Sequence, residues 1–468
     1  MPDFKLLING EMVAGDHDLD VVNPGTEALA GTCSRASESQ LDQAVEAARK
    51  ALPSWAATPI EERRKAVEKV ADIVLEHAPE LGAILTSEQG KPLAEGVAEA
   101  YGLGVFTKHF AAMDLPVEIL EESETRRVEV HRTPLGVVAA IIPWNFPLVL
   151  LGFKLGPALM AGNTLVVKPA PTTPLATLRV AELVKDALPP GVLNVIADAN
   201  DLGSKISAHA DVRKVSFTGS SVTGAKVMAG AASTLKRITL EMGGNDAGLI
   251  LGDVDPKEVA PRIFSAAFQN NGQLCIAMKR VYAHESIYDE LCDELAAIAK
   301  SKKVGEGTEE GVELGPLQNK TQYEKVQAII ADAAEKGTII AGGSTLDRPG
   351  YFIEPTIVRD IEEGARLVDE EQFGPVLPVI RFSDPAEALE RINRTQEGLG
   401  GSVWSADADE ARRLALGLDA GTVWVNKHAD LDPGIPFSGA KQSGIGTELG
   451  QEGLEEFTQR RVVNISTE

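Results

Sequence analysis

Apolar residues near the N-terminus recur at the spacing of an α-helix. Between residues 37 and 52 they return every three or four positions, and Ser37 is placed to cap the first turn. Residues 59–77 repeat this spacing, with a proline close to the first turn. Before them, residues 5–15 predict a short hairpin with Asn9-Gly10 at its tip, because this pair adopts the positive φ angles of a tight turn. The opening of the chain is therefore predicted to be mostly helical.

The pattern changes after residue 134, where continuous apolar runs predict strands buried on both faces. The predicted strands alternate with amphipathic helices and lie at 135–142, 164–170, 192–196, 213–217 and 237–241. Alternation of this kind predicts a doubly wound α/β domain. A second α/β region begins with the strand 247–251 and runs to about residue 440.

Residues 115–133 alternate charged and β-branched side chains, which predicts an exposed two-stranded ribbon. The end of the chain, residues 458–466, predicts a further strand able to join that ribbon. An exposed ribbon offers an unpaired edge to a partner. We therefore expect an oligomerisation arm.

Composition excludes several classes of protein. A chain of 468 residues with 44% hydrophobic and 24% charged residues is expected to fold into two or three domains. A net charge of −24 argues against nucleic acid and anionic membranes as partners. The apolar run 135–151 is broken by prolines, so we expect no membrane span, and the first residues do not resemble a signal peptide. Three cysteines are too few for a disulfide framework, which favours a cytoplasmic location.

Cys275 is the first candidate for chemistry. It lies in the stretch FQNNGQLCIAMKR, residues 268–280, whose Asn, Gly and Gln residues favour an irregular, open loop in which a thiol is reachable. The alternative is a buried free cysteine that acts only as a small hydrophobe. Cys292 has helical apolar spacing and is predicted to be core, and Cys33 receives no role. No metal site is predicted.

Ligands of parallel α/β sheets bind at the carboxyl ends of the strands. In this chain those ends carry PWN at 143–145, KP at 168–169 and TGS at 218–220. Together with VVKPA, FTGSSVTG, EMGGN, GQLC, EQFGPV and PFSGAKQSG, the motif PWNFP resembles the aldehyde dehydrogenase superfamily, in the right order over nearly the whole chain.

The resemblance implies a Rossmann-like cofactor domain, a second α/β catalytic domain and a small β arm. The implied bounds are 1–115 and 134–243 for NAD(P) binding, 244–442 for catalysis, and 116–133 with 443–468 for the oligomerisation arm and tail. The implied activity is oxidation of an aldehyde to a carboxylic acid in a homodimer or homotetramer.

Three residues match the family's catalytic positions. Cys275 matches the nucleophile, whose thiohemiacetal loses hydride and becomes a thioester. Asn145 matches the side-chain donor to the oxyanion, working with the Cys275 backbone N–H. Glu241 matches the general base that activates the hydrolytic water, and such a base works best when burial raises its pKa. A turn residue and a solvated strand-end charge are the structural alternatives for Asn145 and Glu241.

Cofactor contacts follow from the same resemblance. The matching positions are Pro143, Trp144, Lys168, Pro171, Gly203, Phe217, Gly219, Ser220, Glu371 and Phe373. Many NAD-preferring members carry a glutamate three residues after the lysine, where this chain has Pro171. Its loss relaxes discrimination and leaves Lys168 to pair with a 2′-phosphate. NAD is the expected cofactor, with NADP as a second one.

The aldehyde tunnel is matched by Phe146, Leu150, Phe153, Gln269 and Ile276, and by the loop 427–433. None of these positions is arginine, which argues against substrates with a second carboxylate. The specific aldehyde is left open. Three other functions are weighed: a CoA-acylating dehydrogenase, which tends to lack a base such as Glu241; a cysteine esterase with a vestigial cofactor site; and a structural protein, which Cys275 and Asn145 argue against.

Overall fold

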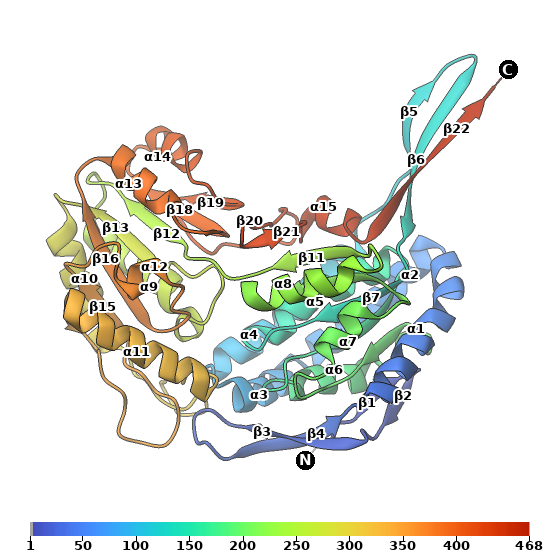
Figure 1. Cartoon of the computed structure of the whole chain (residues 1–468), viewed down its shortest axis with the longest axis horizontal. Helices are drawn as coiled ribbons and strands as arrows, with labels where there is room; N and C mark the ends of the chain where they lie inside the picture. The colour runs from blue at the N-terminus through green and yellow to red at the C-terminus, as the bar shows by residue number, and fades with distance from the viewer. Residues whose placement is uncertain (1–2, 468) are drawn as a thin grey trace.

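The computed structural model describes residues 3–467 and contains two sheets side by side, each covered by helices, with a narrow arm that projects from the first (Figure 1). The first sheet has eight strands in the order β2-β1-β9-β8-β7-β10-β11-β21. In that order they span Glu11–Val13, Leu6–Ile8, Leu193–Val195, Thr164–Lys168, Val137–Ile141, Val212–Thr218, Arg237–Glu241 and Gly444–Ile445. The five strands from β9 to β11 are parallel, as the apolar runs predict.

Eight helices belong to the first half of the described chain. They are α1 (Glu38–Ala57), α2 (Ile60–Glu76), α3 (Ala78–Gln89), α4 (Leu93–Ala111), α5 (Pro147–Met160), α6 (Leu175–Val184), α7 (Gly203–Ala208) and α8 (Ser221–Ala232). The predicted cap is confirmed, because the Ser37 side chain accepts from the Gln40 N–H and the Gln40 side chain accepts from the Ser37 N–H. The predicted hairpin is also confirmed, with Asn9 and Gly10 at φ 55° and 81°.

The second sheet has seven strands in the order β14-β15-β16-β13-β12-β18-β19. They span Thr338–Ala341, Thr356–Arg359, Val376–Phe382, Arg280–His284, Ala247–Ile250, Gly400–Trp404 and Thr422–Val425, and only β14 pairs antiparallel to its neighbour. Its helices are α9 (Pro256–Phe268), α10 (Tyr288–Ser301), α11 (Lys320–Lys336), α12 (Arg366–Asp369), α13 (Pro385–Asn393) and α14 (Ala408–Ala415). The two sheets confirm the predicted α/β class.

One apolar core continues from the first sheet into the second half of the chain. It contains Ile276, Leu399 and Trp424 beside residues of α4 and α5, and the partly buried Cys275 packs against it. The two α/β halves therefore meet at the predicted nucleophile. Cys292 lies in a separate core on α10 and is fully buried, as its spacing predicts.

The arm is a three-stranded sheet in the order β22-β6-β5, formed by Thr458–Ser466, Arg126–Pro134 and Glu118–Glu122. Nine residue pairs join β22 to β6, from Thr458 opposite Pro134 to Ser466 opposite Arg126, so the predicted union of tail and ribbon is confirmed. The rest of the predicted tail lies elsewhere: β21 pairs with β11, and α15 (Gly450–Glu455) packs on α5. The arm therefore takes only residues 458–466 of the predicted tail 443–468.

The sequence interpretation missed a two-stranded ribbon, β3 (His17–Val22) and β4 (Leu29–Arg35), which runs below the first half (Figure 1), and its turn bonds to Gly350 and Tyr351 of the second half. Its strand β3 is mostly exposed and carries Asp18 and Asp20, so it lacks the apolar alternation that marks a half-buried strand. No helix among the described residues is both long and apolar enough to cross a bilayer.

Candidate active site

The loop before Cys275 is irregular, as predicted, but it is buried rather than open. Asn270, Asn271 and Gly272 have φ angles of 48°, 57° and 75°, a left-handed conformation that Asn and Gly tolerate best. The Asn270 and Asn271 side chains donate to the carbonyls of Asn145 and Gly315 at 3.0 and 2.8 Å. Since these amides satisfy buried carbonyl groups, the loop needs no solvent and the prediction of an open loop was wrong.

Asn145 is held with one amide hydrogen that donates to no residue described in the structure. Its Nδ2 donates to the Gln273 carbonyl at 3.0 Å, and its own carbonyl accepts from Lys91 Nζ at 2.9 Å. An amide nitrogen has two hydrogens, and the one bond to Gln273 fixes the direction of the second. No described residue accepts from the Cys275 backbone N–H. The site therefore has two oriented donors beside the thiol, the arrangement that an oxyanion requires.

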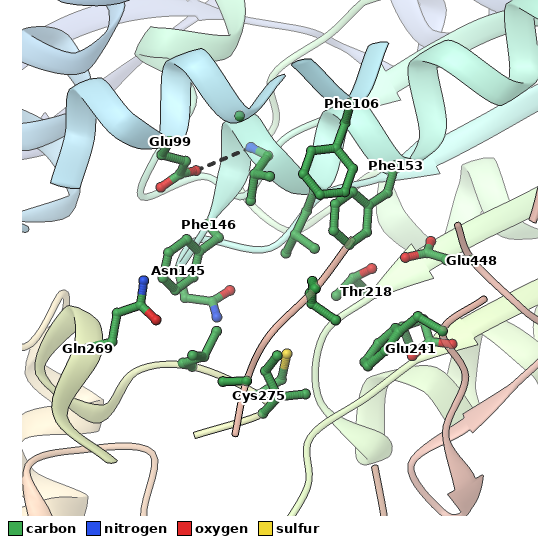
Figure 2. A pocket seen from close by; sticks show the side chains of 18 of the residues that line it. Glu99, Phe106, Asn145, Phe146, Phe153, Thr218, Glu241, Gln269, Cys275 and Glu448 are labelled. Atoms are coloured by element: carbon green, nitrogen blue, oxygen red, sulfur yellow. Dashed lines mark hydrogen bonds between the residues drawn. The ribbon is translucent and has the colours of Figure 1, made fainter. Parts of the chain in front are cut away.

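Glu241 ends β11 and is 3% exposed. Neither carboxylate oxygen has a hydrogen-bond partner within the part of the chain that the structure describes. Burial, and then the nearby Glu448 carboxylate, raises the pKa of Glu241 well above its ordinary value. Figure 2 shows Asn145 and Glu241 on either side of Cys275. A carboxyl group in these surroundings holds a proton at a pH where an exposed one has lost it.

A buried ion pair lies next to Glu241. Lys154 on α5 bonds to Glu448 Oε1 at 2.5 Å and to Thr218 Oγ1 at 2.8 Å, and both charged side chains have at most 1% exposure. The second Glu448 oxygen has no partner among the described residues. Lys154 is thus paired with Glu448, and its charge acts on Glu241 without a direct bond, lowering the pKa that burial and Glu448 raise.

The thiol of Cys275 is only partly exposed, and burial raises its pKa to about 12. The opposing influence is Lys279, whose charge lowers the pKa of the same thiol. Lys279 Nζ donates to the carbonyls of Leu274 (3.0 Å) and Cys275, and lies 3.3 Å from Glu371 Oε1. This buried lysine joins the nucleophile's loop to Glu371. In the free protein the thiol is protonated at neutral pH, so attack requires removal of a proton.

Two cavities meet at Cys275. The first, about 380 Å³, is lined by every residue predicted for the aldehyde tunnel, namely Phe146, Leu150, Phe153, Gln269 and Ile276. Phe106 and Phe437 add aromatic surface, and the Phe106 and Phe153 ring centroids lie 4.8 Å apart (Figure 2). The predicted loop 427–433 contributes Ala429, Asp430 and Leu431. No described residue lining this cavity is lysine or arginine.

The other side of Cys275 opens into a cavity of about 210 Å³, which adjoins an outer one of about 520 Å³. Pro143, Trp144, Gly219 and Ser220 line both, Glu371 and Phe373 line the inner one, and Lys168, Gly203 and Phe217 line the outer one. Ser220 caps α8, so the positive end of a 12-residue helix faces this space. A Cβ atom at Gly243 would lie 2.2 Å from Glu371 Oε2, which explains the need for glycine there.

Two of the residues predicted to contact the cofactor, Pro171 and Lys168, do not have the surroundings that the prediction requires. Pro171 is not among the residues that line the outer cavity. The Lys168 ammonium is paired with Asp198 Oδ1 at 2.7 Å, with both side chains buried. Lys168 therefore has an acidic partner even though position 171 is proline and not glutamate.

Sequence reasoning gave no role to Lys154, Glu448, Lys279 or Asp198. One signal was available: Lys154 is the only charged residue in the apolar helix PLVLLGFKLGPALM. A lysine at such a position needs a buried partner. The sequence could not identify that partner, because Glu448 lies 294 residues away along the chain.

Comparisons with known proteins agree with this geometry. The family model for the aldehyde dehydrogenase family matches residues 12–463. The chain is 39% identical to a mitochondrial aldehyde dehydrogenase of Leishmania tarentolae, covering 99% of this chain and 95% of the relative. It is also 39% identical to a phenylacetaldehyde dehydrogenase of Pseudomonas fluorescens, with coverages of 99% and 96%.

A solved structure gives the same result for the fold. The NAD⁺ complex of an aldehyde dehydrogenase from Bacillus cereus is 37% identical and superposes with a TM-score of 0.97, covering 99% of this chain and 97% of that one. The chain therefore belongs to the aldehyde dehydrogenase family, whose members are NAD(P)-dependent oxidoreductases that convert aldehydes to carboxylic acids.

Proposed function

We propose that this aldehyde dehydrogenase is of the hydrolytic type, with Cys275 as nucleophile, Asn145 as oxyanion donor and Glu241 as general base. The observation that carries the proposal is that an apolar cavity and a cofactor-sized cavity reach the same thiol from opposite sides. Only a residue at that junction can bond to an aldehyde carbon while a hydride leaves that carbon toward a second ligand.

The first step is attack of the Cys275 sulfur on the aldehyde carbon. The thiol proton leaves to water in the cavity as the carbon–sulfur bond forms, and the positive charge of Lys279 favours this loss. Asn145 Nδ2 and the Cys275 backbone N–H donate to the oxygen as it gains negative charge. Oxidised nicotinamide, when bound, accepts the hydride that converts the thiohemiacetal into a thioester.

The second step is hydrolysis of the thioester. Glu241 removes a proton from water, the hydroxyl adds to the thioester carbon, and the sulfur leaves as the thiol by taking that proton from Glu241, which releases the carboxylic acid. Overall, aldehyde, water and NAD(P)⁺ become acid, NAD(P)H and a proton. Lys154 lowers the pKa of Glu241 and favours its anion, whereas the Glu448 carboxylate raises that pKa and favours the protonated form.

The residues of the outer and inner cavities fit a dinucleotide. The α8 N-terminus with Gly219 and Ser220 would hold the pyrophosphate, because a helix end with a glycine offers N–H groups to an anion at close approach. Glu371 would accept from the ribose next to the nicotinamide, and the Trp144 and Phe373 rings, 5.4 Å apart, would border the nicotinamide ring. Lys168, Gly203 and Phe217 are left for the adenosine half.

The substrate class follows from the apolar cavity. Aromatic rings and the absence of cationic side chains among its described lining favour an aromatic or medium-length aliphatic aldehyde over one with a second carboxylate. Glu95 and Glu99 lie on the same wall, and Lys91, which pairs with Glu99, is not among the residues that line the cavity. The second carboxylate of a dicarboxylic semialdehyde would therefore find no cationic partner there.

The test follows reduced nicotinamide by absorbance, with phenylacetaldehyde, hexanal and succinic semialdehyde as substrates. We expect turnover of the first two without added coenzyme A, and at least about tenfold lower kcat/KM for the third. Turnover that requires coenzyme A would establish the acylating alternative. Ester hydrolysis with no dehydrogenase signal for any aldehyde would establish the esterase.

For assembly, we propose that β22 pairs with another copy of this chain. Its nine residues form an outer strand of the arm, and Val462 and Ile465 are exposed at 57% and 39%. An exposed apolar edge of this length favours β-sheet addition by a partner. Deleting residues 458–468 should convert a dimer or tetramer into monomers or aggregates in light scattering. An unchanged mass would contradict this role.

For domain organisation, we propose 3–115 with 135–243 for cofactor binding, 244–442 for catalysis, and 116–134 with 458–466 for the arm. A cytoplasmic location is proposed from the free state of Cys33, Cys275 and Cys292. Cell fractionation with an antibody to the chain tests that location.

A further inference from the structure

The Lys168 ammonium has a fixed acidic partner at the outer end of the cofactor cavity. Lys168 ends β8, one of the central strands, and its side chain is 5% exposed. Its Nζ lies 2.7 Å from Asp198 Oδ1 and 3.3 Å from the Pro169 carbonyl. Asp198 is fully buried, so this pair is shielded from solvent much more than a surface ion pair.

Asp198 is itself held in place. Its second oxygen, Oδ2, accepts from the Leu202 N–H at 2.9 Å, immediately before α7 begins at Gly203. Gly203, Ser204 and Ser207 of α7 line the outer cavity together with Lys168. The carboxylate therefore joins the end of β8 to the start of α7 and cannot turn away from the lysine without breaking a second bond.

The place of this pair along the cofactor follows from the two cavities. Cys275 and Phe373 border the inner cavity, where the hydride leaves, while Gly219 and Ser220 border both cavities. Lys168 borders only the outer cavity, so the part of the cofactor next to it would be the adenosine ribose. In dinucleotide-binding folds an acidic side chain at that ribose favours NAD, and an unpaired cation favours the 2′-phosphate of NADP.

We propose that Asp198 determines the cofactor preference of this enzyme in favour of NAD. Its carboxylate pairs with the ammonium of Lys168, so the lysine that lines the cavity brings no net positive charge toward a 2′-phosphate, which carries close to two negative charges. Pro171 carries no charge and does not line the cavity, so it neither attracts nor repels that phosphate. The inference rests on the proposed dinucleotide site, and it replaces the expectation that the missing glutamate opens the enzyme to NADP.

The test measures binding without turnover, by calorimetric titration of ADP-ribose and 2′-phospho-ADP-ribose into wild type, Asp198→Asn, Asp198→Glu and Asp201→Asn. Asp198→Asn removes the charge and keeps one acceptor oxygen, so it can accept from Leu202 N–H or from Lys168 but not from both. Asp201 is the matched control, because it is a carboxylate in the same loop whose partner is Arg35 at 2.6 Å. Melting temperatures establish that each variant is folded.

Wild type is expected to prefer ADP-ribose, and Asp198→Asn to shift the ratio of the two dissociation constants toward the phosphorylated ligand by about tenfold or more. Asp198→Glu and Asp201→Asn should keep the wild-type ratio. Adding Lys168→Met to Asp198→Asn should abolish the gain. An unchanged ratio in Asp198→Asn, or an equal shift in Asp198→Glu, would overturn the inference. Absence of ADP-ribose binding in wild type would instead contradict the proposed cofactor site.

Discussion

The two sides of Cys275 are built in different ways. The cofactor side consists of strand ends and turns, such as Trp144 after β7 and Gly219 after β10, which lie at one edge of the first sheet. The substrate side consists of side chains from α4 and α5 and from distant loops, such as Phe106, Phe153 and Leu431. Backbone groups at a sheet edge suit a ligand whose binding depends little on side-chain identity, whereas the side chains of helices and loops set the shape of the substrate cavity.

Removing the residue that both sides share should have the largest effect. Cys275→Ala is expected to lower dehydrogenase kcat/KM by about 10⁴-fold or more, because Cys275 is the only thiol among the described residues that line both cavities and the Thr218 hydroxyl there accepts from Lys154. The measurement is the rate of NAD(P)H formation. ADP-ribose binding should be unchanged, and substantial residual turnover would refute the assignment of the nucleophile.

Glu241→Gln should affect only the half of the reaction that involves water. We expect steady-state kcat to fall by about 10³-fold while a first turnover of NAD(P)H, measured by rapid mixing, persists as a burst. Glutamine keeps the shape of the side chain but cannot accept the proton. Loss of the burst together with kcat would assign Glu241 to thiol activation as well.

The pH dependence sharpens this prediction. Burial and Glu448 raise the Glu241 pKa, so its carboxylate form accumulates only at a higher pH than that of an exposed carboxyl group. In wild type, kcat should therefore rise with pH through that raised pKa and fall on acidification. The residual kcat of Glu241→Gln should not show this rise with pH. If the rise persists in that variant, the group that titrates is not Glu241.

Asn145→Ala should cost about 10²-fold in kcat, because one of two oxyanion donors is lost. The loss should appear equally for NAD(P)H formation and for ester hydrolysis, since both pass through an oxyanion on the same carbon. Asn145→Asp serves as the matched variant, because it keeps the size but presents a negative charge to the oxyanion, and it should be at least as damaging. An effect confined to cofactor affinity would contradict the donor role.

The smallest effect is expected on the substrate side. Phe153→Ala removes one of two rings whose centroids are 4.8 Å apart and enlarges the apolar cavity. Phenylacetaldehyde should lose about tenfold in kcat/KM relative to a longer aliphatic aldehyde. The dissociation constant of ADP-ribose should stay at the wild-type value. A shift in that constant would show that the two sides are coupled through α5.

Local sequence determined the framework and pointed to the proposed nucleophile. The apolar runs of β7, β8 and β10 and the Asn9-Gly10 turn act over a few residues, so their conformations follow from neighbouring side chains. The same is true of the motifs at the strand ends, which chain connectivity alone brings to one edge of a sheet. This is why the residues predicted for both sides of Cys275 lie together in the structure, with Pro171 the exception.

Tertiary structure alone decided how the charges are paired. Lys154 and Glu448 meet across 294 residues, and the short loop between β9 and α7 brings Asp198 to Lys168. It also decided that the Asn270–Gly272 loop is buried, because the carbonyl groups that satisfy its amides come from distant segments. Such pairings depend on packing in three dimensions, which periodicity along the chain does not encode.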